Sequence, residues 1–169
     1  RCSECDYAAN SECAALSPVE AGPRNADGGP ALVDTPGQST IEQVCEFLGR
    51  PAEQLAKTLI YKVDGEFIAA MVRGDRDLNE FKLRNLLGAE SLEMASPADI
   101  LKVTGASVGF SGPVGLADSV KIIADYEVNA MGDFVVGANK DDAHLVGVEV
   151  ERDFSVAEFA DIREAVLGD

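Results

Sequence analysis

The 169-residue sequence contains no tryptophan, a single histidine and few aromatic residues of any kind, which make up 6% of the chain. It also lacks any apolar run near the roughly 20 residues that a membrane-spanning helix needs. Its first residues do not have the pattern of a signal peptide. Since 46% of the residues are nonetheless apolar, we expect a cytoplasmic globular domain with a sizeable core and no membrane partner.

Basic residues are scarce as well. The chain has 14 lysines and arginines against 30 aspartates and glutamates, a net charge of −16. Nucleic-acid affinity depends mostly on cationic contacts to phosphate. We therefore expect the domain to bind RNA weakly on its own, so that an RNA substrate would have to be held by another part of a larger enzyme.

The cysteines and the one histidine offer little for a metal. Cys2 and Cys5 form a C-x-x-C pair, whereas a structural zinc site needs four ligands, usually two such pairs. Two reduced thiols remain the alternative, and disulfides are not expected in the cytoplasm. Cys45 falls on the apolar side of an expected helix, as an inert core thiol would. We expect no catalytic metal.

Capping patterns and glycine stops predict four helices. They cover residues 39–48, 78–87, 96–103 and 155–167. β-rich runs predict strands between them, two of which flank the hairpin dipeptide Asp64-Gly65. These strands cover residues 55–63, 66–72, 120–124, 134–136 and 145–150.

This order of elements predicts an α/β fold of the α+β kind, a mixed and mainly antiparallel sheet surrounded by helices. Residues 17–30 are rich in Pro, Gly, Ala and Asn, which is typical of a linker. We therefore divide the chain into an N-terminal strip and linker, residues 1–30, and a main domain, residues 31–169.

Lys57 is unusual for its strand. Because alternate residues of a strand share a face, Lys57 should point the same way as Leu55, Leu59 and Tyr61. A lysine among apolar neighbours is costly unless it meets an anion or a cavity. The alternative is a snorkelling lysine at a strand edge.

Residues 105–116 contain four glycines and a proline. A loop so poor in side chains can bring backbone N–H groups close to a carbonyl oxygen and act as an oxyanion hole. A plain turn is the alternative. If the loop binds substrate, we expect Gly109→Val to fold but to act slowly. The segment 137–144 ends in His144, the single histidine. This residue is either part of a pocket or a hydrogen-bonded core histidine.

Several segments, taken in their order along the whole chain, carry a family resemblance. They are residues 2–10, 33–42, 57–61, 72–83, 109–116, 137–144, 152–154 and 160–163. Together they resemble the editing insertion of bacterial-type prolyl-tRNA synthetases, within the YbaK/ProX type of aminoacyl-tRNA deacylases. The resemblance implies hydrolysis of alanine from the proline tRNA, because a synthetic pocket made for proline also admits the smaller alanine.

The resemblance also implies roles for particular residues. Those with a catalytic role would be Lys57, Gly109, Gly112, Pro113 and His144. Those that bind the substrate would be Leu59, Phe110, Ser111, Gly137, Ala138 and Asn139. Lys57 would hold a phosphate near the terminal adenosine, and the ribose 2′-hydroxyl would help to place the attacking water.

The partners that the resemblance implies are the 3′ end of the proline tRNA carrying alanine and the rest of the synthetase chain, in a homodimer. Editing would need no cofactor, and ATP and magnesium would serve only the full-length synthetase. Two other functions fit the residues. One is a free-standing deacylase that acts in trans, and the other is a non-catalytic module that positions tRNA.

Overall fold

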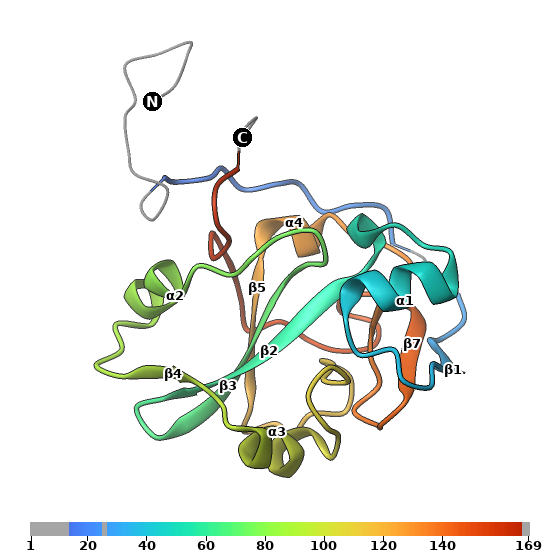
Figure 1. Ribbon diagram of the computed structural model, residues 1–169. Coiled ribbons are helices and arrows are strands. Elements are labelled where there is room, and N and C mark those ends of the chain that lie inside the picture. The colour runs from blue at the N-terminus through green and yellow to red at the C-terminus, as the bar shows by residue number, and fades with distance from the viewer. Residues whose placement is uncertain (1–13, 25–26, 167–169) are drawn as a thin grey trace.

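The computed structural model describes residues 14–24 and 27–166, which form two sheets flanked by short helices (Figure 1). The smaller sheet has the order β1-β7-β6, with bounds Ala31–Asp34, Ala143–Val148 and Phe134–Gly137. The larger has the order β4-β2-β3-β5-β8, with bounds Leu92–Met94, Ala56–Val63, Glu66–Arg73, Lys121–Asp125 and Glu158–Ala160. The expected Cys2–Cys5 pair lies outside the described residues.

The hairpin of β2 and β3 forms where the sequence predicts it. Asp64 and Gly65 both have positive φ, 48° and 95°, as a two-residue turn between antiparallel strands requires. Val63 therefore pairs with Glu66, and the register continues to Ala56 opposite Arg73. Because β3–β5 and β5–β8 are parallel, the sheet is mixed, which confirms the predicted fold class.

Three of the four expected helices are present, and their ends follow the capping signals. They are α1 (Ile41–Leu48), α2 (Glu80–Leu87) and α3 (Pro97–Thr104). The capping box of α1 is formed by Thr40 and Gln43, one residue later than the expected box of Ser39 and Glu42, and a left-handed glycine ends each helix. Two short helical elements were not expected, the 3₁₀ helix η1 (Ala52–Gln54) and α4 (Tyr126–Asn129), and neither were the strands β1 and β4.

The helix expected over residues 155–167 is wrong, because the segment adds β8 to the larger sheet. The N–H of Ala157 donates to the carbonyl of Ile122 at 2.8 Å. Phe159 then packs into the core on one side of the sheet, and Ala160 into the core on the other. This alternation buries both faces of the segment, which a helix at the sheet edge would not do.

Three apolar clusters hold the elements together. One lies between the two sheets and includes Ile60, Met71, Phe134 and Val136. A second lies on the other face of the larger sheet, against α2, and a third joins α1 to β6 and to Leu55, just before β2. Among the described residues, no helix is long and apolar enough to cross a membrane.

Candidate active-site pocket

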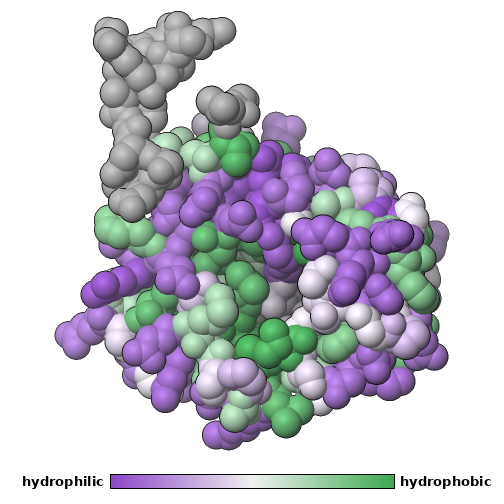
Figure 2. Space-filling model, in the orientation of Figure 1, coloured by the Kyte–Doolittle hydropathy of each residue, from purple (hydrophilic) through white to green (hydrophobic). Residues whose placement is uncertain are grey.

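A cavity of about 280 Å³ opens where α1, β2, β6 and α3 meet. Its lining is mostly apolar, with Ile60, Ile100 and Val136 in the interior. Met94 and Val108 also line it and are 56% and 55% exposed. Figure 2 shows apolar residues gathered near the middle of the face seen in Figure 1, with hydrophilic residues to either side.

The cavity brings together six of the eleven residues singled out in the sequence. These six are Lys57, Leu59, Gly109, Ser111, Gly137 and His144. The other five do not line it. They are Phe110, Gly112, Pro113, Ala138 and Asn139, and Pro113 lines a second hollow near β5 and residues 153–157. Residues as far apart in the sequence as Lys57 and His144 thus meet in one place, as a functional site requires.

Lys57 meets an anion as well as the cavity. Its Nζ lies 3.1 Å from Oδ1 of Asp77. Its side chain is only 23% exposed, whereas that of Asp77 is 81% exposed. An ion pair with one partner in water is weak. Asp77 can therefore give way to another anion without a large loss of stability.

His144 lines the cavity and is also bonded within the fold. It lies in β7 opposite Gly137 and is 5% exposed. Its Nδ1 is 2.7 Å from the hydroxyl of Thr35, itself fully buried. Burial lowers the pKa of His144 below its ordinary value, so the ring is neutral near pH 7. It acts there as a hydrogen-bonding group and not as a cation.

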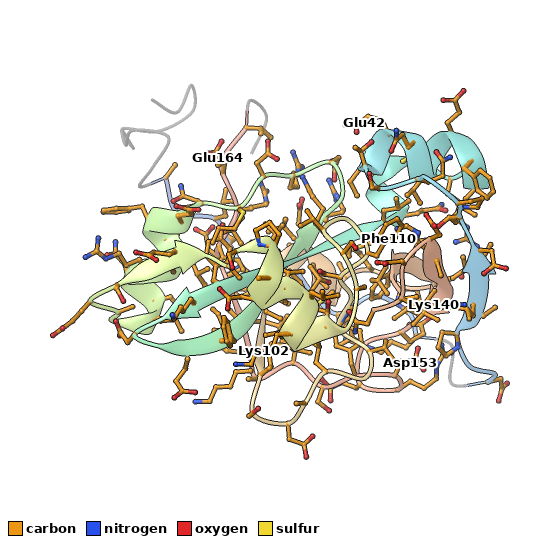
Figure 3. The ribbon with its side chains drawn as sticks, turned by 60° about the horizontal axis from the view of Figure 1, so that its bottom comes forward. Glu42, Lys102, Phe110, Lys140, Asp153 and Glu164 are labelled. Atoms are coloured by element: carbon orange, nitrogen blue, oxygen red, sulfur yellow. The ribbon has the colours of Figure 1, made fainter. Side chains whose placement is uncertain are left out.

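Phe110 supports His144 from behind. The two ring centroids are 5.7 Å apart and the ring planes are tilted by 59°. Phe110 is 6% exposed, and Figure 3 shows it inside the fold, whereas Glu42 and Glu164 lie at the periphery. Its structural effect is to fix the position of the imidazole.

Asn139 fastens the glycine-rich loop. It has a φ of 51°, and its Oδ1 accepts from the N–H of Gly112 at 2.8 Å. Its Nδ2 donates to the carbonyls of Gly112 and Val114 at 3.0 and 2.9 Å. The backbone N–H of Gly112 is thus used within the protein.

The loop needs its glycines for close backbone packing. Gly109 has a φ of +99°, and a Cβ there would come within 2.6 Å of the carbonyl oxygen of Ser39. A Cβ on Gly112 would strike the carbonyl of Gly137, and one on Gly137 would strike that of Ser111. The expectation that Gly109→Val folds normally is therefore wrong, since valine is strained at that φ and lacks space.

Several N–H groups of the loop remain for a ligand, and two of them belong to glycine-rich positions singled out in the sequence. Within the described part of the chain, the backbone N–H groups of Gly109 and Ser111 have no protein acceptor. Those of Phe110 and Gly112 donate to Ser107 and Asn139. Both Gly109 and Ser111 line the cavity, so the loop can present donors to an oxygen bound there.

Other chemistry is sparse around the cavity. Over residues 14–24 and 27–166, no group of three or more His, Cys, Asp or Glu side chains is placed to hold a metal ion. Cys45 packs beside Val44 in the cluster under α1, and burial raises the pKa of its thiol. It is therefore a poor nucleophile.

Residues 35–154 match the family model described as an aminoacyl-tRNA editing domain. The chain is 52% identical over 169 residues to a proline–tRNA ligase of Citrifermentans bemidjiense. It is 49% identical over 168 residues to one of Nitratidesulfovibrio vulgaris. In both cases 99% of this chain is covered, and the chain spans only 29% of the length of the relative.

Solved structures share the fold. One, described as a putative trans-editing enzyme for prolyl tRNA synthetase, has a TM-score of 0.67 at 19% identity, over 80% of this chain and 87% of that one. A hypothetical protein has a TM-score of 0.66 at 22% identity, over 80% of this chain and 91% of its own. These two likenesses concern the fold, whereas the family model and the ligase relatives carry the family assignment.

Proposed function

The chain belongs to the aminoacyl-tRNA editing domain family, and on that premise we propose that it hydrolyses alanine wrongly attached to the proline tRNA. One observation supports this most directly. Lys57, the free N–H groups of Gly109 and Ser111, and neutral His144 all border the same small apolar cavity. A cavity of this kind suits the small side chain of an aminoacyl ester, with polar groups for its reacting end.

The proposed reaction is attack of water on the ester carbonyl. As the tetrahedral intermediate forms, the N–H groups of Gly109 and Ser111 stabilise the negative charge on the carbonyl oxygen. The bond from the carbonyl carbon to the ribose oxygen then breaks, the ribose oxygen takes up a proton, and alanine leaves as a carboxylate. Lys57 moves from Asp77 to a phosphate near the terminal adenosine and so positions the ester.

No obvious general base borders the cavity. No Asp, Glu or Cys belongs to its described lining, and His144 is already bonded to Thr35. We therefore propose that the 2′-hydroxyl of the terminal ribose helps to place the attacking water. We also propose that editing needs no metal or other cofactor, and that ATP and magnesium serve only the remainder of a full-length ligase.

The acidic charge of the chain indicates that the rest of such a ligase holds the tRNA. The net charge of −16 repels the phosphate backbone, and Lys57, Arg73 and Arg76 are each within 4 Å of a carboxylate. We propose that the chain acts as part of a cytoplasmic, homodimeric proline–tRNA ligase that binds the proline tRNA.

Deacylation assays test this proposal. Proline tRNA charged with alanine, cysteine or proline is incubated with this chain and with a proline–tRNA ligase that contains it, with and without a chelator. We expect fast release of alanine, slow release of proline, no effect of chelation and a much higher tRNA affinity for the ligase. Loss of activity that zinc restores would refute the metal-free mechanism. Absence of hydrolysis with intact tRNA binding would favour a positioning module, and equal affinities a free-standing deacylase.

A further inference from the structure

One edge of β2 faces the cavity directly. Six consecutive residues, Leu55 to Ile60, line it, although alternate side chains of a strand point to opposite faces. What the cavity meets along this stretch is therefore the edge of the strand. β4 covers the same edge only at Tyr61–Val63, and an isolated bridge joins Leu55 to Val135 at the other end.

The register identifies which backbone groups lie on that edge. In a two-residue hairpin the residues next to the turn exchange hydrogen bonds, and every second residue behind them does the same. With Val63 opposite Glu66, odd-numbered residues of β2 bond to β3. Consistent with this, the carbonyl of Ile60 accepts from the N–H of Ala95 at 2.9 Å on the edge of β2 that faces away from β3.

The N–H and carbonyl of Thr58 consequently face the cavity, as does the carbonyl of Ala56. Across the described part of the chain, this edge is paired only at Tyr61–Val63, by β4, and at Leu55, by the isolated bridge, so no strand pairs with it at Thr58. An open strand edge inside a mostly apolar cavity is a row of donors and acceptors without partners. Such groups are costly to bury unless a ligand or water satisfies them.

The side-chain hydroxyl of Thr58 also lacks a hydrogen-bond partner in the described structure. Thr58 is 7% exposed, and its Oγ1 is buried without a hydrogen-bond partner among the described residues. Buried hydroxyls are nearly always bonded, and valine has the same shape without this cost. A χ1 rotation of about 120° exchanges Oγ1 with the methyl group and so redirects the hydroxyl.

We propose that the open edge of β2, centred on Thr58, binds the α-ammonium group of the aminoacyl ester, a role that rests on the proposed function. No carboxylate belongs to the described lining, so uncharged acceptors must hold this cation. The edge supplies the carbonyls of Ala56 and Thr58 and the Thr58 hydroxyl. The side chain of Lys57 alternates to the opposite face of the strand from that of Thr58, which keeps the lysine charge away from the ammonium group.

Exchange of the ammonium group tests this contact. Single-turnover hydrolysis of alanyl- and lactyl-tRNA is compared, because lactate differs from alanine only by a hydroxyl in place of the amino group. We expect wild type to prefer alanyl-tRNA at least tenfold. We expect Thr58→Val to slow alanyl-tRNA hydrolysis about tenfold, as the loss of a hydrogen bond to a charged group implies, and to leave lactyl-tRNA hydrolysis unchanged. Thr58→Ser should keep most of the preference.

Thermal unfolding provides a second readout. Thr58→Val should raise the melting temperature, because it removes a buried hydroxyl that has no partner. Thr104→Val is the matched control, since the hydroxyl of Thr104 donates to the carbonyl of Ile100 at 2.9 Å and Thr104 is not part of the cavity lining. It should lower the melting temperature and preserve the alanyl preference.

The outcomes separate this proposal from the proposed function. Equal slowing of both substrates by Thr58→Val would overturn the ammonium contact and leave the deacylase intact. If wild type hydrolyses neither substrate, binding of 3′-alanylamino- and 3′-lactylamino-3′-deoxyadenosine decides instead. If wild type binds the alanyl compound more tightly and Thr58→Val abolishes this preference, the ammonium contact is upheld although the hydrolytic function has failed. No preference would refute the contact.

Discussion

The cavity wall at Thr58 and the cluster around Glu127 are both polar, but their hydrogen-bonding groups are used in opposite ways. The carboxylate of Glu127 forms ion pairs with three arginines, Arg76 at 3.0 Å, Arg163 at 3.2 Å and Arg73 at 3.4 Å. Thr58 is equally enclosed and has a hydroxyl with no partner in the described structure. One region has its polar groups satisfied by the protein, and the other leaves them for something else.

The difference separates architecture from chemistry. The Glu127 cluster joins the end of β3, α4 and the segment after β8, which are far apart in the sequence. Beside it, buried Asp125 accepts from the N–H groups of Glu127 and Ile162 at 3.0 and 3.1 Å. Such groups hold the sheet together. The cavity wall instead costs stability, as sites that await a ligand commonly do.

The largest effect should come from the loop that closes the cavity. In Gly112→Ala the new Cβ would strike the carbonyl of Gly137, so we expect the free energy of unfolding to fall by more than about 4 kcal/mol. Urea unfolding followed by circular dichroism measures it. Gly29→Ala is the control, because nothing lies within 4 Å of its Cβ position. A Gly112→Ala protein as stable as wild type would show that the backbone contact is adjustable.

Loss of the central carboxylate tests the satisfied region. Glu127→Ala leaves Arg73, Arg76 and Arg163 close together without their shared anion, so we expect a loss of about 3 kcal/mol of stability. Hydrolysis per folded molecule should not change. Asp34→Ala, which breaks an exposed pair with Lys140 at 3.9 Å, should change stability little. A Glu127→Ala protein that is stable but inactive would reverse the comparison.

Substitution of Lys57 should change activity and leave stability nearly unchanged, the converse of Glu127→Ala. Lys57→Ala removes an exposed pair with Asp77, so the free energy of unfolding should change by less than about 1 kcal/mol. Alanyl-tRNA hydrolysis should fall about 100-fold, as expected when one positioning and charge-stabilising contact is removed. Proline activation by a ligase that carries the variant is the control and should remain. Unchanged deacylation would remove Lys57 from the site.

The smallest effect concerns pH. Burial lowers the pKa of His144 below its ordinary value of 6.5. As the pH falls below about 6.5, the unfolded chain takes up a proton that the folded protein does not, so stability decreases over that range and is fully present above it. Since His144 is the only histidine in the sequence, its NMR titration can be followed without overlap. A midpoint at or above 6.5 would contradict this.

Asp125 provides the opposite sign in the other region. Burial raises its pKa above the ordinary 3.8. Its contribution to stability is therefore fully present at pH values below 3.8 and is lost as the pH rises through the higher value in the folded protein. The two groups thus change stability with opposite signs as the pH rises, so urea unfolding of His144→Gln and Asp125→Asn at several pH values can assign each effect to its region.

The sequence predicts what is decided locally. Thr40, Ser96 and the terminal glycines set the ends of the helices, and Asp64-Gly65 sets the hairpin. Lys57 and His144 are also recognisable, one as a cation on an apolar face and the other as the single imidazole. The residues after Ser155 mislead, because apolar spacing that fits a helix is overridden by the open edge of β5.

Thr58 could not be found in this way. Its alternation with Lys57 predicts a buried side chain, but the lack of a partner depends on where β4 ends and on where β6 approaches β2. Thr35, which bonds His144 across 109 residues, depends in the same way on the pairing of β1 with β7. Both result from contacts between distant segments, which a local pattern does not contain.

The length of the open β2 edge has a consequence for what can enter. An exposed strand edge invites another strand to pair with it, as in peptide recognition by strand addition and in aggregation. Here β4 closes one end at Tyr61 and the bridge from Leu55 to Val135 closes the other. The free stretch between them amounts to the backbone of little more than one residue. A single amino acid can pair there, whereas a peptide or the strand of a second molecule finds too few bonds to hold it.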